Sequence, residues 1–492
     1  MRRSGILMHI SSLPTDYGIA KLGKEAYAFV DFLEKAHQKC WQILPISPTS
    51  YGDSPYQSFS VHAGNPYFID LEALEKEGYL KPAEYKDIEW GDDKGSVDYG
   101  KIYEVIFKVL RTAHKRFRKK PEKAYSKFVV ENKDWIYDYA LFMSLKFANK
   151  GKAWYEWDEP LKMYKPKAIK SARKEYANDI DFWCFVQYKY FQQWKKLKAY
   201  ANEKGIEIIG DIPIYVAYDS VEVWSTPQYF SLDKEKKPVE VAGCPPDAFT
   251  ADGQLWGNPL YNWEYIARDK FRWWVERIKA ASDTYDVVRI DHFRGFESYY
   301  CIPYGAKNAK KGKWRKGPDM RLFKEVRKQL GDVKIIAEDL GFLTKHVVKM
   351  LNASGYPGMK VLEFGFDSDN TNGYLPHNFK TTNSICYTGT HDNETILGWI
   401  KSCDEKTRSY CKDYLGVTKD EFVPWAMVRL CWSSVCDTAI AQMQDILCLD
   451  DKARMNTPST VGANWKWRLE SFDKLDDTLA ERLAKITAVY GR

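Results

Sequence analysis

The stretch VVRIDHFRG at residues 287–295 joins a buried strand to a polar end. Val287, Val288 and Ile290 are apolar and β-branched, and Asp291 closes the run. A continuous apolar run of this kind, rather than an alternating one, is typical of a parallel strand that is covered on both faces. The charged residues that follow it are then expected at the carboxyl edge of a parallel sheet.

Seven further runs of the chain have a similar character. They are Gly5–His9, Trp41–Pro45, Glu207–Asp211, Lys334–Glu338, Lys360–Phe364, Ser384–Thr388 and a weaker one near Ala453–Asn456. Helical patterns lie between several of these runs, at residues 21–36, 268–281, 321–330 and 344–353. Strands that alternate with helices form βαβ units, so the sequence predicts an α/β fold, a (β/α)8 TIM barrel with large helical and loop insertions.

Uneven spacing of the strands indicates two insertions within one catalytic barrel of residues 1–492. Residues 66–200 carry aromatic residues at helical spacing, such as Trp135, Tyr139 and Phe142, and we expect a mainly helical subdomain there. Residues 213–265 include a stretch rich in Gly, Pro and Asp at residues 243–259. Long irregular loops are often binding loops, so we expect a loop-rich insertion that covers the active site.

The composition excludes several classes of protein. Hydrophobic residues make up 45% of the chain and the net charge is only +7, which permits a large core and does not favour a nucleic-acid partner. The densest basic run, at residues 111–120, is interpreted as a solvated helix face. The ten cysteines show no zinc-type spacing, and the sequence has neither a signal peptide nor about 18 consecutive apolar residues. It therefore predicts a cytoplasmic protein with free thiols and no membrane partner.

Acidic residues lie at the ends of four predicted strands. Asp211, Asp291 and Glu338 end three of them, and Asp392 follows the strand at residues 384–388. In a barrel these ends converge on one face, where like charges repel and raise one another's pKa values. A single aspartate after a strand often caps a helix, but four acidic ends together predict a functional site.

Paired carboxylates without a metal-binding motif are typical of glycosidic bond cleavage. One carboxylic acid protonates the leaving oxygen while a carboxylate attacks or stabilises the anomeric carbon. Arg289 lies two residues before Asp291, so both point to the same side of the strand, and the guanidinium would keep this nucleophile ionised. Glu338 has no such neighbour in sequence and is suited to hold a proton as the acid. His292 and His391 are candidates to bind sugar hydroxyls, with a purely structural role as the alternative.

Seven segments, taken in order, carry a resemblance to a known family. They are SPYQS at 54–58 with AGNP at 63–66, GDIPIY at 210–215, LWGNPLY at 255–261, RIDHFRG at 289–295, AEDLG at 337–341, GTHDN at 389–393, and RMNTP at 454–458 with NWKWR at 464–468. Through them the chain resembles, nearly end to end, the amylomaltases or 4-α-glucanotransferases (disproportionating enzymes), glycoside hydrolase family 77 of the α-amylase-like clan.

This resemblance implies roles for individual residues. Asp291 matches the nucleophile, Glu338 the acid/base, and Asp392 the carboxylate that grips sugar hydroxyls and stabilises the oxocarbenium-like transition state. Trp256 matches an aromatic residue on a mobile loop over the cleft, and Asn464 lies on a second loop on the acceptor side. The residues expected to bind substrate are Tyr56, Asp211, Trp256, Arg289, His292, His391 and Asn464.

The predicted reaction is retaining transfer of an α-1,4-glucan segment to the 4-OH of an acceptor glucan or glucose, through a covalent glucosyl-enzyme. We expect no metal and no cofactor, maltooligosaccharides and amylose as partners, and a monomer or homodimer. The alternatives are a hydrolase with the same three acids and a catalytically silent glucan-binding protein. A phosphate-binding barrel is disfavoured, because GTHD at residues 389–392 places an acid where a phosphate cradle would lie.

Overall fold

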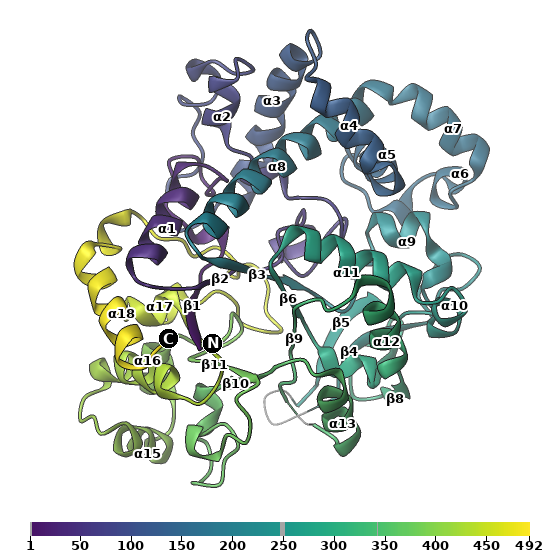
Figure 1. Ribbon diagram of the computed structural model, residues 1–492. Coiled ribbons are helices and arrows are strands. Elements are labelled where there is room, and N and C mark those ends of the chain that lie inside the picture. Colours follow the sequence, from purple (N-terminus) through teal and green to yellow (C-terminus); the bar gives the residue numbers. More distant parts are fainter. Residues whose placement is uncertain (1, 247–250, 342) are drawn as a thin grey trace.

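Eight parallel strands form the centre of the molecule (Figure 1). The computed structural model describes residues 2–246, 251–341 and 343–492. Within these residues the strand order is β10-β11-β12-β1-β2-β3-β6-β9. The strands are β1 (Arg3–Leu7), β2 (Cys40–Gln42), β3 (Glu207–Ile212), β6 (Val287–Ile290), β9 (Ile335–Ala337), β10 (Gly358–Val361), β11 (Ser384–Tyr387) and β12 (Thr438–Gln442).

Hydrogen bonds at the two outer strands close the sheet into a barrel. The backbone N–H of Ala337 in β9 donates to the carbonyl of Pro357, just before β10, at 3.0 Å. The buried side chain of Asp339 accepts from the backbone N–H of Met359 in β10 at 2.6 Å. The predicted (β/α)8 barrel is therefore confirmed.

One of the eight predicted strands is wrong. The segment Ala453–Asn456 does not form a strand, because residues Asp451–Ala453 make a short 3₁₀ turn and the chain then runs on into a loop. The eighth strand is β12, whose sequence is TAIAQ and whose five residues are all buried. Its two alanines give it a weak strand signal, and it is a strand because it pairs with both β1 and β11.

Helices surround the barrel and form its outer layer. Helix α8 packs against α1, and α1 packs against α18, while α11, α12 and α13 continue the ring on the other side. The bounds of these helices are α1 (Lys24–Lys35), α8 (Ala177–Glu203), α11 (Arg272–Thr284), α12 (Met320–Leu330), α13 (Lys345–Ser354), α14 (Ile396–Ser402), α15 (Glu405–Leu415), α16 (Val423–Ser433), α17 (Met443–Ile446) and α18 (Asp477–Val489). The apolar side of α1 explains this packing, because Phe29 meets Trp41 of β2 edge-on at 5.1 Å.

The segment at residues 66–200 is largely helical and lies at one end of the molecule, the top of Figure 1. Its helices are α2 (Leu71–Lys76), α3 (Tyr99–Phe117), α4 (Lys123–Glu131), α5 (Lys133–Ala148), α6 (Glu159–Lys162), α7 (Pro166–Glu175) and most of α8. Aromatic side chains fill the space between them, as where Phe107 meets Trp183 at 5.4 Å. The long helix α8 connects this segment to the barrel, since it packs against β3 and against α1.

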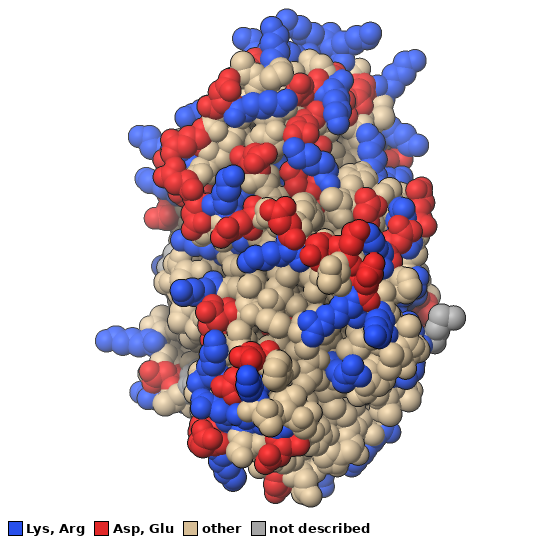
Figure 2. Space-filling model, turned by 90° about the vertical axis from the view of Figure 1, so that its left-hand side faces the viewer, with Lys and Arg blue, Asp and Glu red and all other residues tan. Residues whose placement is uncertain are grey.

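Basic residues project from this helical end, and many of them pair with acids. Figure 2 shows acidic and basic side chains interspersed over one face, with basic ones most prominent at its upper edge. In the predicted solvated run, Arg111 pairs with Asp179 at 2.8 Å and Arg116 with Glu84 at 2.5 Å. These pairs compensate much of the local positive charge.

The segment at residues 213–265 is more regular than a set of loops. It holds α9 (Val221–Ser225), α10 (Trp263–Arg268), β4 (Glu240–Cys244) and β5 (Gln254–Pro259). With β7 (Ser298–Pro303) and β8 (Lys313–Lys316) these strands form an antiparallel sheet of order β5-β4-β7-β8. The stretch at 243–259 thus contains the end of β4 and all of β5, and residues 247–250 between them lie outside the described residues. Its strands depend on pairing with β7, which follows much later in the chain.

Candidate active site

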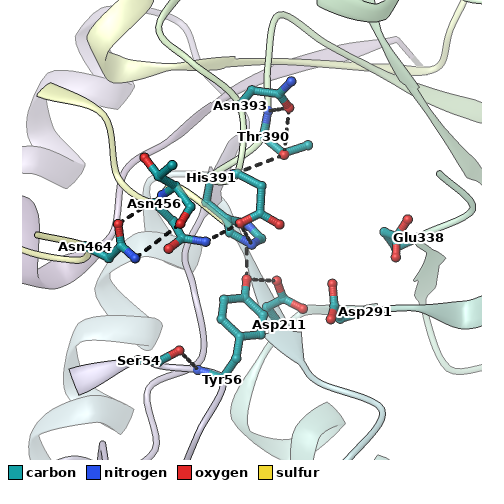
Figure 3. A network of polar contacts seen from close by, with 12 residues as sticks. Ser54, Tyr56, Asp211, Asp291, Glu338, Thr390, His391, Asn393, Asn456 and Asn464 are labelled. Carbon is teal, nitrogen blue, oxygen red and sulfur yellow. Dashed lines mark hydrogen bonds and ion pairs between the residues drawn. The ribbon is translucent and has the colours of Figure 1, made fainter. Parts of the chain in front are cut away.

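Three carboxylates lie together where neighbouring barrel strands end. Asp211 lies near the end of β3, Asp291 directly follows β6, and Glu338 directly follows β9. Because β3, β6 and β9 are adjacent and parallel, their ends share one face of the barrel. Figure 3 shows the three side chains side by side at this face.

A buried arginine holds two of these carboxylates. Arg289 donates one hydrogen bond to Asp211 at 2.5 Å and another to Asp291 at 3.0 Å. Burial alone would lower the pKa of Arg289, but the charges of Asp211 and Asp291 outweigh burial and hold it well above its usual value. The structure thus contains the Arg289–Asp291 contact that the sequence predicts.

Glu338 lies in a different environment, which favours its protonated form. Burial of its side chain, and then the nearby charge of Asp291, raise the pKa of Glu338 to about 7, although Arg289 and two backbone hydrogen bonds act in the opposite direction. The donors of these bonds are the backbone N–H groups of His292 and Leu340, both at 2.7 Å. His292 reaches this position because its backbone is left-handed, with φ of 53°. This face, where β3, β6 and β9 end, is the mouth of the barrel. Asp291 and Glu338 therefore have contrasting environments at one mouth, as a nucleophile and an acid require.

Tyr56 connects the β3 side of the mouth to the turn after β11. Its hydroxyl donates to Asp211 at 2.8 Å and lies 3.2 Å from Nδ1 of His391. The rings of Tyr56 and His391 stack, with centroids 4.8 Å apart, and the Trp465 ring contacts both at a tilt. Burial raises the pKa of Asp211, and its Oδ1 is buried with no hydrogen-bond partner among the described residues.

Asp392 is half exposed and is held by a segment distant in sequence. Asn456 donates to its Oδ1 at 2.6 Å, Arg454 donates to its backbone carbonyl at 2.8 Å, and Nε2 of His391 lies 3.4 Å from Oδ1. Sequence reasoning gave no role to Arg454, Asn456 or Trp465. The only signal for them was their place in the motifs RMNTP and NWKWR.

The remaining predicted residues lie around these acids in different ways. The Trp256 ring meets the His292 ring edge-on, with centroids 4.9 Å apart. Burial lowers the pKa of His292 to about 4, so its imidazole is neutral at pH 7. The side chain of Asn464 forms its hydrogen bonds inside its own loop, accepting from the N–H of Thr457 at 3.0 Å and donating to the carbonyl of Thr460 at 2.9 Å. The structure thus gathers all the predicted residues except Asn464 into contacts around the carboxylates.

Two kinds of feature are absent from the described residues. No helix there has the length and apolar character needed to cross a membrane. No group of three His, Cys, Asp or Glu side chains there is arranged to hold a metal ion.

A parallel barrel with paired carboxylates at its strand ends fits the class of barrel enzymes that cleave glycosidic bonds. Comparison with known proteins identifies the family within that class. The model of the 4-alpha-glucanotransferase family matches residues 8–474, and the chain belongs to this family.

Relatives and a solved structure match the chain over its full length. The 4-alpha-glucanotransferase of Clostridium butyricum is 49% identical over 489 residues, which cover 99% of this chain and 100% of the relative. The 4-alpha-glucanotransferase of Streptococcus pneumoniae is 48% identical and covers 100% of this chain and 97% of its own length. The amylomaltase from Streptococcus agalactiae, solved in complex with acarbose, superposes with a TM-score of 0.97 at 44% identity and 100% coverage of both chains.

Proposed function

We propose that this protein is a 4-alpha-glucanotransferase that moves a segment of an α-1,4-glucan onto the 4-OH of an acceptor glucan or glucose. The observation that carries the proposal is the contrast between Asp291, which is paired with Arg289, and Glu338, whose pKa is raised to about 7. Such a pair supplies a nucleophile and an acid at one mouth. Membership of the family and the names of the relatives support the choice of substrate and of transfer.

In the first step Asp291 is the nucleophile. Its carboxylate attacks C1 of the donor glucan, the bond from C1 to the glycosidic oxygen breaks, and the proton of Glu338 goes to that oxygen. The donor segment is then joined covalently to Asp291, and the shortened chain leaves with a free 4-OH. Arg289 stays bonded to Asp211 and keeps the attacking carboxylate in place.

In the second step Glu338 acts as a base. The 4-OH of an acceptor glucan attacks C1, its proton goes to Glu338, and the bond to Asp291 breaks. Two inversions at C1 give net retention. The raised pKa of Glu338 suits this double role, because a group that titrates near the working pH can both give and take a proton.

The surrounding side chains are proposed to bind the sugar at the point of cleavage. The half-exposed carboxylate of Asp392 accepts hydrogen bonds from its hydroxyls, and the imidazole of His391 forms another. Tyr56 connects Asp211 to His391 and so aligns the two sides of the mouth. Asn464 organises the loop at residues 457–464 on the acceptor side through its bonds to Thr457 and Thr460.

Transfer requires that an acceptor, and not water, reaches the covalent intermediate. Trp256 lies beside His292, the residue after the nucleophile, on a hairpin strand next to the mouth. We propose that this side chain shields C1 from water and lines the path of the glucan. An apolar side chain over C1 would favour transfer over hydrolysis.

The deciding experiment is incubation of the pure protein with maltotriose alone, in the presence of a chelator, with all products separated by chromatography. A ladder of longer maltodextrins together with glucose is the expected result. Glucose and maltose in equal amounts, with no ladder, would make the protein a hydrolase. An unchanged substrate would leave only glucan binding. Size measurement of the same sample distinguishes the monomer from the homodimer.

A further inference from the structure

The turn after β11 presents both His391 and Asp392 to the mouth, and its backbone is held by its own side chains. Oδ1 of Asn393 accepts from the backbone N–H and from the hydroxyl of Thr390, both at 2.9 Å. The backbone N–H of Asp392 lies 3.3 Å from the oxygen of that hydroxyl. Figure 3 shows Thr390 and Asn393 linked in this way above His391. The conformation of this turn therefore depends on the orientation of one amide side chain.

On its other side that amide is held by a glutamate in the 3₁₀ turn that follows the neighbouring strand β10. Nδ2 of Asn393 donates to Oε1 of Glu363 at 2.7 Å. Glu363 follows β10, which pairs with β11, and its backbone N–H faces the carbonyl of Thr388 at 3.4 Å. Because the N–H of Thr390 is always a donor, the oxygen of Asn393 must face Thr390 and its NH₂ group must face Glu363. An acceptor at position 363 therefore stabilises the same orientation of Asn393 that Thr390 requires.

Other acids hold the two ends of the same turn. Asp445 accepts from the hydroxyl of Thr388 at 2.6 Å and from the N–H of Ile396 at 2.8 Å. Asp451 accepts from the N–H of Thr395 at 3.0 Å. These contacts fix where the turn begins and ends, but they do not reach its middle. The middle of the turn is held by Arg454, which donates to the backbone carbonyl of Asp392 at 2.8 Å, and by Gln442 of β12, which donates to the carbonyl of Glu394 at 3.2 Å. Glu363 differs from both because it holds the side chain of Asn393, which itself bonds Thr390.

We infer that Glu363 is a positioning residue for the transfer reaction, which through Asn393 fixes the turn that presents His391 and Asp392 to the sugar. This inference rests on the proposed function. Burial holds the pKa of Glu363 well above its ordinary value; the hydrogen bond from Asn393 acts in the opposite direction, and the charges of Asp445 and Glu394 add to the effect of burial. A neutral carboxylic acid still offers a carbonyl oxygen to Asn393. A glutamine offers the same oxygen.

The test compares three substitutions of Glu363 in the maltotriose assay. Glu363→Gln keeps the acceptor and should have close to the wild-type kcat. Glu363→Met keeps the length of the side chain but removes the acceptor, and its kcat should fall by about 10- to 100-fold with little change in KM, because small misplacements of catalytic groups have effects of this size. Glu363→Asp draws the oxygen away from Asn393 and should be intermediate. Thermal melting of each variant measures its folded fraction at the assay temperature.

A second comparison asks whether Glu363 acts through Asn393. In an Asn393→Ala background the intermediary is missing, so Glu363→Met should cause little further loss of kcat. Independent, multiplicative losses in the double variant would overturn the inference.

The other outcomes are equally decisive. If the wild-type protein makes no maltodextrin ladder, the proposed function fails. If the wild type makes the ladder and folded Glu363→Met has an unchanged kcat, only the inference fails. A loss that Gln does not restore, or one that equals the loss of folded protein, would also overturn it. Should Glu363→Met not fold, the milder Glu363→Asp decides, and an unchanged kcat in that variant would contradict the inference.

Discussion

Strand β3 carries an ion-pair cluster at each end, and the two clusters have opposite charge ratios. At its start, Glu207 accepts from both Arg3 and Lys334, so one carboxylate meets two cations. At its far end, Asp211 shares the single cation of Arg289 with Asp291. Glu207 is partly exposed, whereas Asp211 is almost completely buried.

The difference shows which end of the barrel is arranged for stability and which for chemistry. Partly exposed carboxylates with surplus donors are satisfied by their partners and by water. At the other end acids outnumber the cation in a buried space, and burial raises the pKa values of both Asp211 and Glu338. Such an arrangement is electrostatically unfavourable for the folded protein, and it is retained where a proton must be transferred.

The largest expected effect is that of removing the nucleophile. Asp291→Asn should lower kcat in the maltotriose assay by about 10⁴-fold or more, since the covalent step has no other carboxylate in its place. The matched control is Glu207→Gln at the other end of β3, which should keep the wild-type kcat. A folded Asp291→Asn variant with more than a few per cent of the activity would contradict the assignment.

The next largest effect concerns Glu338→Gln, which should raise the free energy of unfolding although it removes the catalytic acid. The pKa of Glu338 is about 7 in the folded protein, whereas the ordinary value for this side chain is 4.5. The folded state therefore holds the proton more tightly, and wild-type stability should fall as the pH rises from about 4.5 to about 7. Glu338→Gln cannot ionise, so above pH 7 it should be more stable than wild type by up to about 3 kcal/mol.

Denaturant unfolding of both proteins at pH 4.5 and pH 8 measures this difference, which should vanish at the lower pH. The same group should govern the kinetics. As an acid, Glu338 must be protonated, so wild-type kcat/KM should decline as the pH rises through about 7. An equal stability difference at both pH values would mean that Glu338 does not titrate in this range.

A smaller effect is expected at the edge of the mouth, where Trp256 meets His292. Trp256→Ala should raise the ratio of hydrolysis to transfer by roughly tenfold, because water then reaches the intermediate more easily. Quantifying free glucose and reducing ends over time gives this ratio. Trp314, an exposed aromatic residue on β8, is a suitable control position, and Trp314→Ala should leave the ratio unchanged. An unchanged ratio in Trp256→Ala would mean that Trp256 only binds the glucan.

The smallest effect is expected at the start of β3. Glu207→Gln removes a carboxylate from two partly exposed ion pairs, which should cost about 1 kcal/mol of unfolding free energy. The loss should shrink at high salt, because exposed charges are screened. A loss of several kcal/mol would show that the ion pairs of Glu207 contribute far more to stability than partly exposed pairs do. The proposed difference between the two ends of β3 would then be wrong.

Most of the fold could be predicted because buried parallel strands leave a local signal. Seven of the eight runs, including the one at residues 287–291, overlap a strand, and most of them are continuous apolar segments. The run Lys360–Phe364 does so only at its first two residues, because Leu362–Gly365 forms a 3₁₀ turn. The run TAIAQ of β12 was missed because alanines carry little strand preference, and only its two neighbours make it a strand. The hairpin of β4 and β5 was missed for a related reason, since its partner β7 lies beyond β6 in the chain.

By itself the sequence determined which acids could meet. Asp211, Asp291 and Glu338 each end a strand, and the alternation of side chains along β6 places Arg289 on the same side as Asp291. These are local properties of a strand and of the residue that follows it. They hold for any barrel in which these strands become neighbours.

Only the tertiary structure decided what each acid can do. The raised pKa of Glu338 comes from burial and from the charge of Asp291 on a different strand. Asp392 is held by Asn456, and its turn by Glu363 through Asn393, across segments that are distant or separate in the chain. Desolvation and Coulomb interaction depend on distance in space and on the exclusion of water, and neither quantity can be read from spacing along the sequence.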